Sequence, residues 1–513
     1  MILRPALLPA VVGLLLMPVP VSAQADDPIV EVCEDTVGGV ICTSLTAGQV
    51  IAGDLCTALT LPPETCAALA MNPVVDAALV ADHESSWLAR AHALQERLDD
   101  GEPLLNTLII QTHNSNNAAA YDVTVTGFDP NQLYAITDQL RMNMRGIELD
   151  LHWVPSPFGT VETGGRAVVL CHGQSQAVGD VVVHVGCSND RPFDTALVEL
   201  RAWLDDHPGT FLLLYLENQM EDDPVAHDLA AAGIAEHLGG LVHRPVEKCA
   251  PVDWTTTQDD LLDAGTPVLI VGNCGAGGDW GTWVHERGER WREGGSTDTY
   301  PAHPDCVERR GDPDYDENFI RTWEDATWLS AVAGSPADLT PAEAGGMVNC
   351  GLDLIGLDRL VPFDPRLQAM VWSWDVDEPL AESGGCAERQ VTGRFRTQDC
   401  EQELRYACHG QAGWFVPDIP GPWATGFATC EQAGGMFRTP PTGWENTLLS
   451  AAGADAVPVW LNYQSLAGEW ESNTIAVPVS GGPGATPATG GGLAVVGLLL
   501  LSTAVHRTAR RLV

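Results

Sequence analysis

A series of apolar segments that each end on polar or titratable residues constrains this chain more than any other feature. Four such segments follow one another between residues 106 and 218. Continuous apolar segments with helical segments between them are typical of a parallel β-sheet that helices cover. The polar groups at the ends of the four segments are His113 and Asn114, Glu148 and Asp150, His172, and Glu217.

Apolar residues at helical spacing predict helices between these strands, over residues 131–144 and 193–206. The alternation of strands and helices indicates an α/β fold. We expect a TIM-type (β/α)8 barrel of irregular shape, followed by a small disulfide-rich domain. In such barrels the carboxyl ends of the strands meet at one mouth, so the polar groups should converge there.

Later apolar runs predict three further strands, over residues 266–272, 351–356 and 369–374. One more strand is needed to complete eight, and no segment stands out for it. Residues 275–344 are polar and rich in Trp and Asp, which predicts a long loop over the mouth.

Glu148 and Asp150 are two residues apart on a predicted strand, so their side chains share one face. Ile147 and Leu149 then face the opposite, apolar side. Neighbouring carboxylates repel each other, and burying them is costly unless a cation or hydrogen-bond donors compensate the charge. The pair alone is equally compatible with a solvated strand. Its place among the other polar strand ends favours a buried cation site.

Four segments carry a family resemblance in their order and spacing: Thr-His-Asn-Ser at 112–115, Glu-Leu-Asp at 148–150, Cys-His-Gly at 171–173 and Leu-Glu-Asn at 216–218. Together they resemble the catalytic domain of the phosphatidylinositol-specific phospholipase C family. The resemblance implies a phosphoric diester hydrolase that cleaves phosphatidylinositol-type lipids to diacylglycerol and a cyclic inositol phosphate.

The calcium-dependent branch of that family binds its metal with Asn, Glu, Asp and Glu in this order. The resemblance therefore implies Ca²⁺, with Mg²⁺ less favoured, as the cofactor. The metal-independent bacterial branch carries an arginine where Asp150 stands, and Arg145 is the local candidate for that role if no metal binds. The implied metal ligands are Asn114, Glu148, Asp150 and Glu217.

The same resemblance implies a division of catalytic roles. His113 would donate a hydrogen bond to a phosphoryl oxygen, and His172 would protonate the leaving oxygen. Either Glu148 or Glu217 would accept the proton of the inositol 2-hydroxyl, and the sequence leaves that choice open. Each histidine taken singly is also compatible with a buried structural residue.

Two other classes of protein compete with this interpretation. A glycerophosphodiesterase or a sphingomyelinase D-like enzyme uses similar residues on the same barrel, but its first histidine usually stands in a His-Arg-Gly context. Here the context of His113 is His-Asn-Ser. A non-catalytic surface protein that binds lipid or glycan is the second alternative, and the complete set of candidate residues argues against it.

The charge balance limits the partners of the chain. It has 26 basic and 69 acidic residues, a net charge of −43, and Lys248 is its only lysine. Such a surface repels nucleic acid and offers no polybasic patch for anionic lipid. We expect phosphatidylinositol or a related phospholipid at a membrane surface as the partner, and the oligomeric state stays open.

The termini predict export and attachment to the cell envelope. Residues 1–23 have a basic start, an apolar stretch and a small-residue cleavage pattern, which together predict a signal peptide. Residues 473–490 form a Gly/Pro/Thr-rich linker, and residues 491–513 form an apolar, basic-ended membrane anchor or sorting tail. We expect the protein outside the cell, held by this tail.

The remaining domains follow from composition and cysteine content. A cysteine-containing segment with a helix over 78–98 occupies residues 24–100, the barrel residues 101–380, and a Cys/Trp-rich domain residues 386–472. The fourteen cysteines form no C-x-x-C pair, so we expect disulfides rather than zinc. The first four cysteines allow three pairings.

Overall fold

The computed structural model describes residues 30–36, 39–45, 76–121, 130–172, 174–178, 181–185, 191–274, 278–294, 299–308, 312–323, 339–380 and 385–472. The predicted signal peptide, linker and C-terminal tail lie outside these residues. In the N-terminal segment the backbone forms a hairpin of β1 (Val30–Thr36) and β2 (Gly39–Leu45), in which Cys33 and Cys42 are opposite each other.

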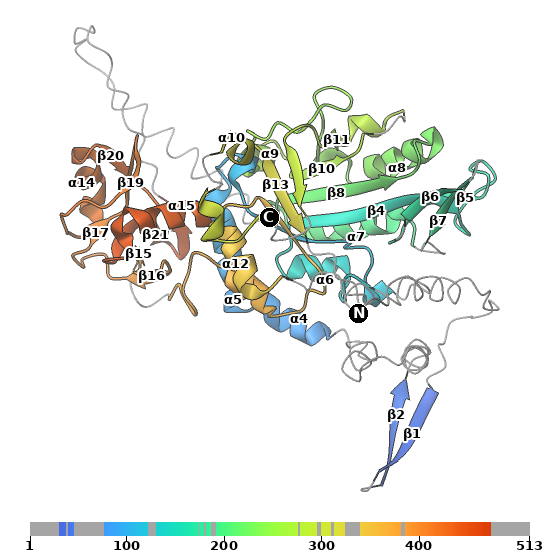
Figure 1. The fold of residues 1–513 in the computed structure, drawn as a ribbon, viewed down its shortest axis with the longest axis horizontal. Coiled ribbons are helices and arrows are strands. Elements are labelled where there is room, and N and C mark those ends of the chain that lie inside the picture. The colour runs from blue at the N-terminus through green and yellow to red at the C-terminus, as the bar shows by residue number, and fades with distance from the viewer. Residues whose placement is uncertain are drawn as a thin grey trace, which may run out of the picture. The chain divides into compact units, whose positions relative to one another are not determined.

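A parallel sheet forms the centre of the molecule, and its strands follow one another in chain order around an open barrel (Figure 1). The ladder runs β11-β10-β8-β4-β3-β14-β13-β12, and every neighbouring pair in it is parallel. Within the described part of the chain no ladder joins β11 to β12, so the barrel opens there. The strands are β3 (Ile109–Thr112), β4 (Gly146–Pro155), β8 (Leu212–Gln219), β10 (Val268–Gly272), β11 (His285–Glu286), β12 (Trp291–Gly294), β13 (Phe319–Trp323) and β14 (Leu354–Leu357).

The predicted TIM-type barrel is thus confirmed, but two predictions about its second half are wrong. The polar segment 275–344 contains β11, β12 and β13 and is not simply a loop. These strands are short, and polar residues such as Arg292 and Arg321 interrupt their apolar pattern. The predicted strand 369–374 is instead the end of helix α13 (Pro365–Met370) and an extended segment.

The side chain of Gln95 explains why residues 371–373 need no strand neighbour. Its oxygen accepts hydrogen bonds from the backbone N–H groups of Trp372 and Ser373, at 2.8 and 3.3 Å. Trp374 is fully buried and packs against Trp470, with 4.7 Å between the ring centroids. Trp374 is therefore a core residue and does not face the mouth.

The third of the four apolar segments is not a barrel strand. β5 (Arg166–Leu170) pairs antiparallel with β4, because the connection of residues 156–165 is too short for a parallel crossover. The backbone N–H of Cys171 donates to the carbonyl of Asp150. This hairpin returns the chain to the mouth and places His172 beside the middle of β4, near Asp150.

Helices cover the outer face of the sheet. The predicted helix 193–206 is confirmed as α7 (Phe193–Asp206), whereas α6 (Ile136–Arg141) is shorter than the predicted 131–144. Residues before α6 are not helical, because Gln132 donates its side-chain amide to the carbonyls of His113 and Leu357. The other helices along the barrel are α8 (Pro224–His237), α9 (Gln258–Asp263), α10 (Pro313–Asp316) and α12 (Pro341–Asn349).

The single helix predicted over 78–98 is two helices, α4 (Ala77–Glu84) and α5 (Trp87–Asp99). Ser86 separates them, and its hydroxyl caps the start of α5. The carboxylate of Asp99 accepts a hydrogen bond from the backbone of Leu108, which precedes β3. As predicted, α5 packs at the amino end of the barrel. No helix in the described ranges has the length and hydropathy of a membrane span.

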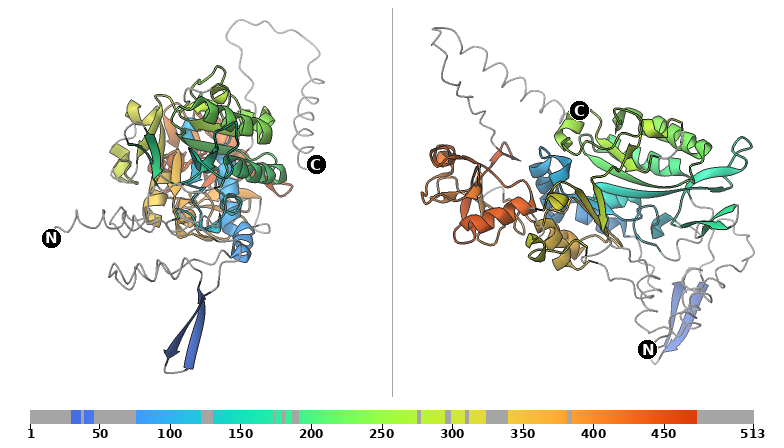
Figure 2. Two further views of the ribbon diagram at one scale, coloured as in Figure 1. Left: turned by 90° about the vertical axis from the view of Figure 1, so that its right-hand side faces the viewer. Right: turned by 45° about the horizontal axis from the view of Figure 1, so that its top comes forward.

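Residues 385–472 form the Cys/Trp-rich unit, drawn in orange and red in Figures 1 and 2. Disulfides Cys386–Cys400 and Cys408–Cys430 tie it together, and Cys249–Cys274 and Cys306–Cys350 tie the barrel. The helices of the Cys/Trp-rich unit are α14 (Gly426–Gln432) and α15 (Gly443–Leu449). Its two sheets contain β15 (Cys386–Arg389), β16 (Phe395–Gln398), β17 (Arg405–Tyr406), β21 (Val459–Leu466) and β22 (Glu469–Glu471), and β18 (Cys408–Gly410), β19 (Gly413–Phe415) and β20 (Gly435–Phe437).

The alternation of side chains along β8 separates two apolar layers. Leu212, Leu214 and Leu216 join the core between sheet and helices, whereas Leu213 and Tyr215 join a second cluster inside the barrel. Stacked aromatic rings, such as Trp254 and Phe319 with centroids 4.2 Å apart, fill that inner cluster. The barrel lumen is thus apolar at its amino end, and polar groups are confined to the other end.

Candidate active site

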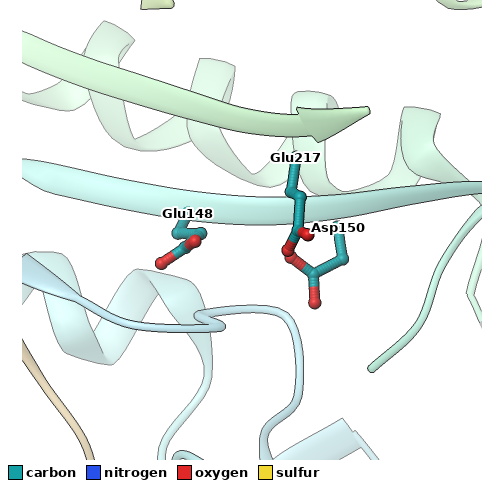
Figure 3. A group of neighbouring side chains, drawn as sticks. All are labelled: Glu148, Asp150 and Glu217. Carbon is teal, nitrogen blue, oxygen red and sulfur yellow. The ribbon is translucent and has the colours of Figure 1, made fainter. Parts of the chain in front are cut away.

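Three carboxylates meet on the inner face of the sheet, near the carboxyl end of β8 and midway along β4 (Figure 3). Glu148 and Asp150 lie two residues apart on β4, and Glu217 on β8 is the register partner of Asp150. One oxygen from each side chain lies within 4.8 Å of the others. Glu148 and Asp150 are buried, and Glu217 is half-buried.

Burial of this group shifts the ionisation of its central member. Desolvation raises the pKa of Asp150 well above its usual value, and the negative charges of Glu217 and Glu148 raise it further. A cation beside these carboxylates would favour the ionised form of Asp150. Convergent carboxylate oxygens are the donor set that Ca²⁺ prefers, so the residues present fit a hard divalent ion.

An arginine already compensates one of the three charges. Nη2 of Arg321, on β13, lies 2.5 Å from Oε2 of Glu148, and both side chains are 3% exposed. The same oxygen accepts hydrogen bonds from the Gln111 side chain and from the backbone of Asn114. Among the described residues, all hydrogen bonds to the Glu148 carboxylate fall on Oε2. Glu148 is thus held firmly in place on one side.

Aromatic rings and a second acid hold Arg321 in turn. Its guanidinium lies 4.3 Å from the ring centroid of Tyr215 and 4.8 Å from that of Trp323. Glu293, on β12, lies 3.5 Å from Nη1 of the same arginine. The sequence suggested Arg145 as the arginine that would act beside the carboxylates if no metal binds, and this prediction is wrong. Arg145 pairs with Glu96 on α5, away from the mouth.

Asn114 lies between Asp150 and His113. With its amide nitrogen toward Asp150, it donates to Oδ2 at 2.7 Å, and its oxygen accepts from Nε2 of His113 at 3.2 Å. This orientation satisfies both neighbours. Asn114 is therefore beside the carboxylate group, but its oxygen points to the histidine here.

His113 follows β3 and pairs with an acid that the sequence did not single out. Its Nδ1 lies 3.1 Å from Oδ2 of Asp358, which directly follows β14. Burial alone would lower the pKa of His113, but the charges of Asp358 and Glu148 and the hydrogen bond to Asp358 outweigh it. The pKa of His113 is raised to about 9, so the imidazole is protonated at neutral pH.

A chain of hydrogen bonds joins the two candidate histidines. Nδ2 of Asn117 donates to Asn131 at 2.7 Å and lies 3.2 Å from Nδ1 of His172. Asn131 donates to Oδ1 of Asp358 at 3.0 Å, and Asp358 binds His113 through its other oxygen. Both histidines therefore belong to one polar network at the mouth.

The structure thus brings all the sequence-predicted residues to one end of the barrel and adds several that the sequence did not indicate. Asp358 stands directly after a predicted strand, so the strand-end pattern that found the other residues applies to it also. Arg321 belongs to a strand hidden in a polar segment. Asn117 and Asn131 carried no sequence signal, since their partners are distant in the chain.

Comparison with known sequences finds a family and two relatives. The family described as Rv2075c PI-PLC-like domain matches residues 68–364, a range that contains all four motif segments. The uncharacterized proteins Rv2075c and MT2135, from two strains of Mycobacterium tuberculosis, are each 32% identical over 397 residues. The alignment covers 74% of this chain and 80% of each relative.

Solved structures of phosphatidylinositol-specific phospholipases C are more distantly similar. The enzyme from Listeria monocytogenes is 12% identical, with a TM-score of 0.36 over 55% of this chain and 97% of its own. One from Staphylococcus aureus is 11% identical, with a TM-score of 0.34 over 57% of this chain and 98% of its own. The fold assignment here rests on strand order and direction.

Asp358→Asn should lower the pKa of His113 from about 9 toward the ordinary histidine range, because the nearest negative charge and its hydrogen bond are lost. NMR titration of the imidazole in chelator measures it, with the wild type and the variant titrated in parallel. The wild-type ring should lose its proton only as the pH rises through about 9, and the variant's ring at lower pH. Equal midpoints in the two proteins would contradict the assignment.

Proposed function

Because the chain belongs to the Rv2075c PI-PLC-like domain family, we propose that it is a calcium-dependent phosphodiesterase that cleaves phosphatidylinositol-type lipids to diacylglycerol and a cyclic inositol phosphate. Its membership in this family confirms the family resemblance of the four motif segments. One observation carries the proposal: two linked histidines and three convergent carboxylates share the mouth of the barrel.

The proposed metal ligands are Glu148, Asp150, Glu217 and Asn114. When bound, Ca²⁺ would offset the carboxylate charges, polarise a phosphoryl oxygen and lower the pKa of the attacking hydroxyl. Asn114 would join the ligands with its amide oxygen turned away from His113. Burial and the charges of Glu217 and Glu148 raise the pKa of Asp150, and a bound cation would offset these charges.

Of the two candidate bases, Glu217 is the better one. Glu148 would have to give up its ion pair with Arg321 to take a proton, which would leave a buried guanidinium unpaired. Glu217 is half-buried. Apart from its contact with the other carboxylates, it accepts one hydrogen bond from the described residues, and the donor is the side chain of Gln219. We therefore assign to Glu217 the proton of the inositol 2-hydroxyl.

The two histidines take different roles. His113 is protonated at neutral pH, so its imidazolium suits a donor to the phosphoryl oxygen on which charge builds up. Asp358 fixes its ring through Nδ1 and leaves Nε2 toward the site. His172 is half-buried at the rim and contacts Asn117 of the same hydrogen-bond network, and we assign it the general acid.

We also propose that the enzyme acts outside the cell at a membrane surface. Every cysteine whose side chain the structure describes is disulfide-bonded, which favours an oxidising compartment. The large negative charge makes binding through a polybasic patch implausible, so access to lipid would depend on apolar contacts and on the substrate itself.

Asp150→Asn should weaken calcium binding and lower turnover by about a hundredfold or more, because a ligand charge is lost while the shape is kept. Calorimetry with calcium and assays on phosphatidylinositol vesicles measure the two effects. Asp418→Asn is the matched control, since its side chain is 86% exposed, and should change neither. Full wild-type activity in excess chelator would contradict the metal assignment.

His172→Ala should slow diacylglycerol release by about a hundredfold to ten-thousandfold, because the leaving oxygen loses its proton donor. A nitrophenyl phosphodiester of inositol needs no such donor, so the variant should recover most of its rate on it. His207→Ala serves as the control for removing a half-buried imidazole. Equal losses on both substrates would show that His172 positions the phosphate instead.

A chain truncated after Ser472 should be released to the medium as active enzyme, because it lacks the predicted linker and tail. The full chain should stay with the cell envelope. Cell fractionation with mass spectrometry of the carboxyl terminus separates the outcomes. Full-length chain free in the medium with residues 491–513 attached would contradict the attachment.

A further inference from the structure

A cavity of about 300 Å³ lies between the β15–β16 hairpin, helix α15 and the segment after α13. It borders Asn349, which ends α12 and precedes β14, so it lies toward the amino ends of the barrel strands. The catalytic mouth is at their other ends. The cavity therefore has no part in the proposed reaction.

Two arginines flank the turn of this hairpin and line the cavity. Arg389 ends β15, Arg394 precedes β16, and Gly393 between them has the positive φ that the turn requires. In a chain with net charge −43, this concentration of positive charge is unusual.

Arg394 has no acidic partner. Its side chain makes no hydrogen bond to any described residue, and its Nη1 is buried without a partner. Burial lowers the pKa of Arg394, and the nearest carboxylate, Asp375, offsets this only in part. Asp375 is itself held by Arg396 at 2.6 Å. Nη1 of Arg394 is thus a buried donor that has no partner among the described residues.

Arg389 is fully buried and is bound mainly by neutral groups. Its Nε donates to the Asn446 side chain at 2.6 Å, and Nη1 donates to the carbonyl of Ala454 at 3.2 Å. The one acid beside it is Asp455, at 3.5 Å, whose side chain is 61% exposed. Burial lowers the pKa of Arg389 as well. The cavity therefore holds more positive than negative charge.

We propose that this cavity binds a small-molecule oxyanion of the phosphate or carboxylate class, with Arg394 as its principal ligand. A guanidinium presents paired N–H groups that match such an anion, and a buried site strengthens the interaction. The volume lies at the lower end of ligand pockets, which fits a small molecule rather than a polymer. Hydroxyl and amide groups of Thr392, Thr447 and Asn446 complete the polar lining.

Such a ligand would connect the Cys/Trp-rich unit to the barrel. Asn446 already donates to the carbonyl of Trp372 at 3.3 Å and to that of Gly393 at 2.9 Å. Thr447 donates to the carbonyl of Asn349. An anion on Arg394 would sit among these contacts, so its binding should stabilise the folded chain.

The test is thermal unfolding of the full chain in chelator, titrated with sodium phosphate against sodium chloride of equal ionic strength, with calorimetry on the same samples. The wild type should show a saturable rise in Tm and saturable heat with phosphate, or with acetate in a parallel titration. Arg394→Gln should abolish both. Since it removes an unpaired charge, this variant should fold as well as the wild type without ligand.

Arg396→Gln is the matched control, because this arginine lies two residues away with a side chain 52% exposed and paired to Asp375. It should keep the full response. His113→Ala should keep it as well, whereas loss of the response in that variant would place the anion at the catalytic mouth and overturn the proposal. An absent response to both anions in the wild type, or an equal response in Arg394→Gln, would also overturn it.

Discussion

Two neighbouring parallel strands place three carboxylates on the inner face of one sheet. The other residues of the site are arranged so that they compensate this negative charge. Asp150 and Glu217 are register partners on adjacent strands, so the backbone keeps their side chains close together. Arg321 neutralises Glu148 from across the barrel, and Tyr215 supports the guanidinium from below. A divalent cation would compensate the remaining negative charge.

A network of hydrogen bonds through asparagine side chains holds the two histidines in place. Asp358 uses both of its oxygens, one for His113 and one for Asn131, and so couples the first strand of the barrel to the last. Asn117 extends this network to His172, which a short hairpin rather than a barrel strand delivers to the mouth. The two histidines are thereby held by hydrogen bonds, which favours a fixed geometry of their rings.

Sequence patterns predicted the first half of the barrel well, because its strands are continuous apolar runs and α7 has a regular apolar stripe. They failed for β12 and β13, because these strands are short and Arg292, Glu293 and Arg321 interrupt their apolar pattern. The candidate ligands were found because Glu148 and Asp150 are neighbours in the chain. Arg321 was not, since its partner Glu148 is 173 residues away and only the curved sheet brings them together.

The central claim is that these groups, with calcium, cleave phosphatidylinositol to diacylglycerol and a cyclic inositol phosphate. Phosphorus NMR of the products formed from phosphatidylinositol vesicles tests it most directly, in parallel samples with calcium and with excess chelator. The account predicts the resonance of a cyclic inositol phosphate in the calcium sample and unchanged lipid in the chelator sample. Formation of phosphatidic acid or a glycerophosphoryl product, or equal turnover in chelator, would contradict it.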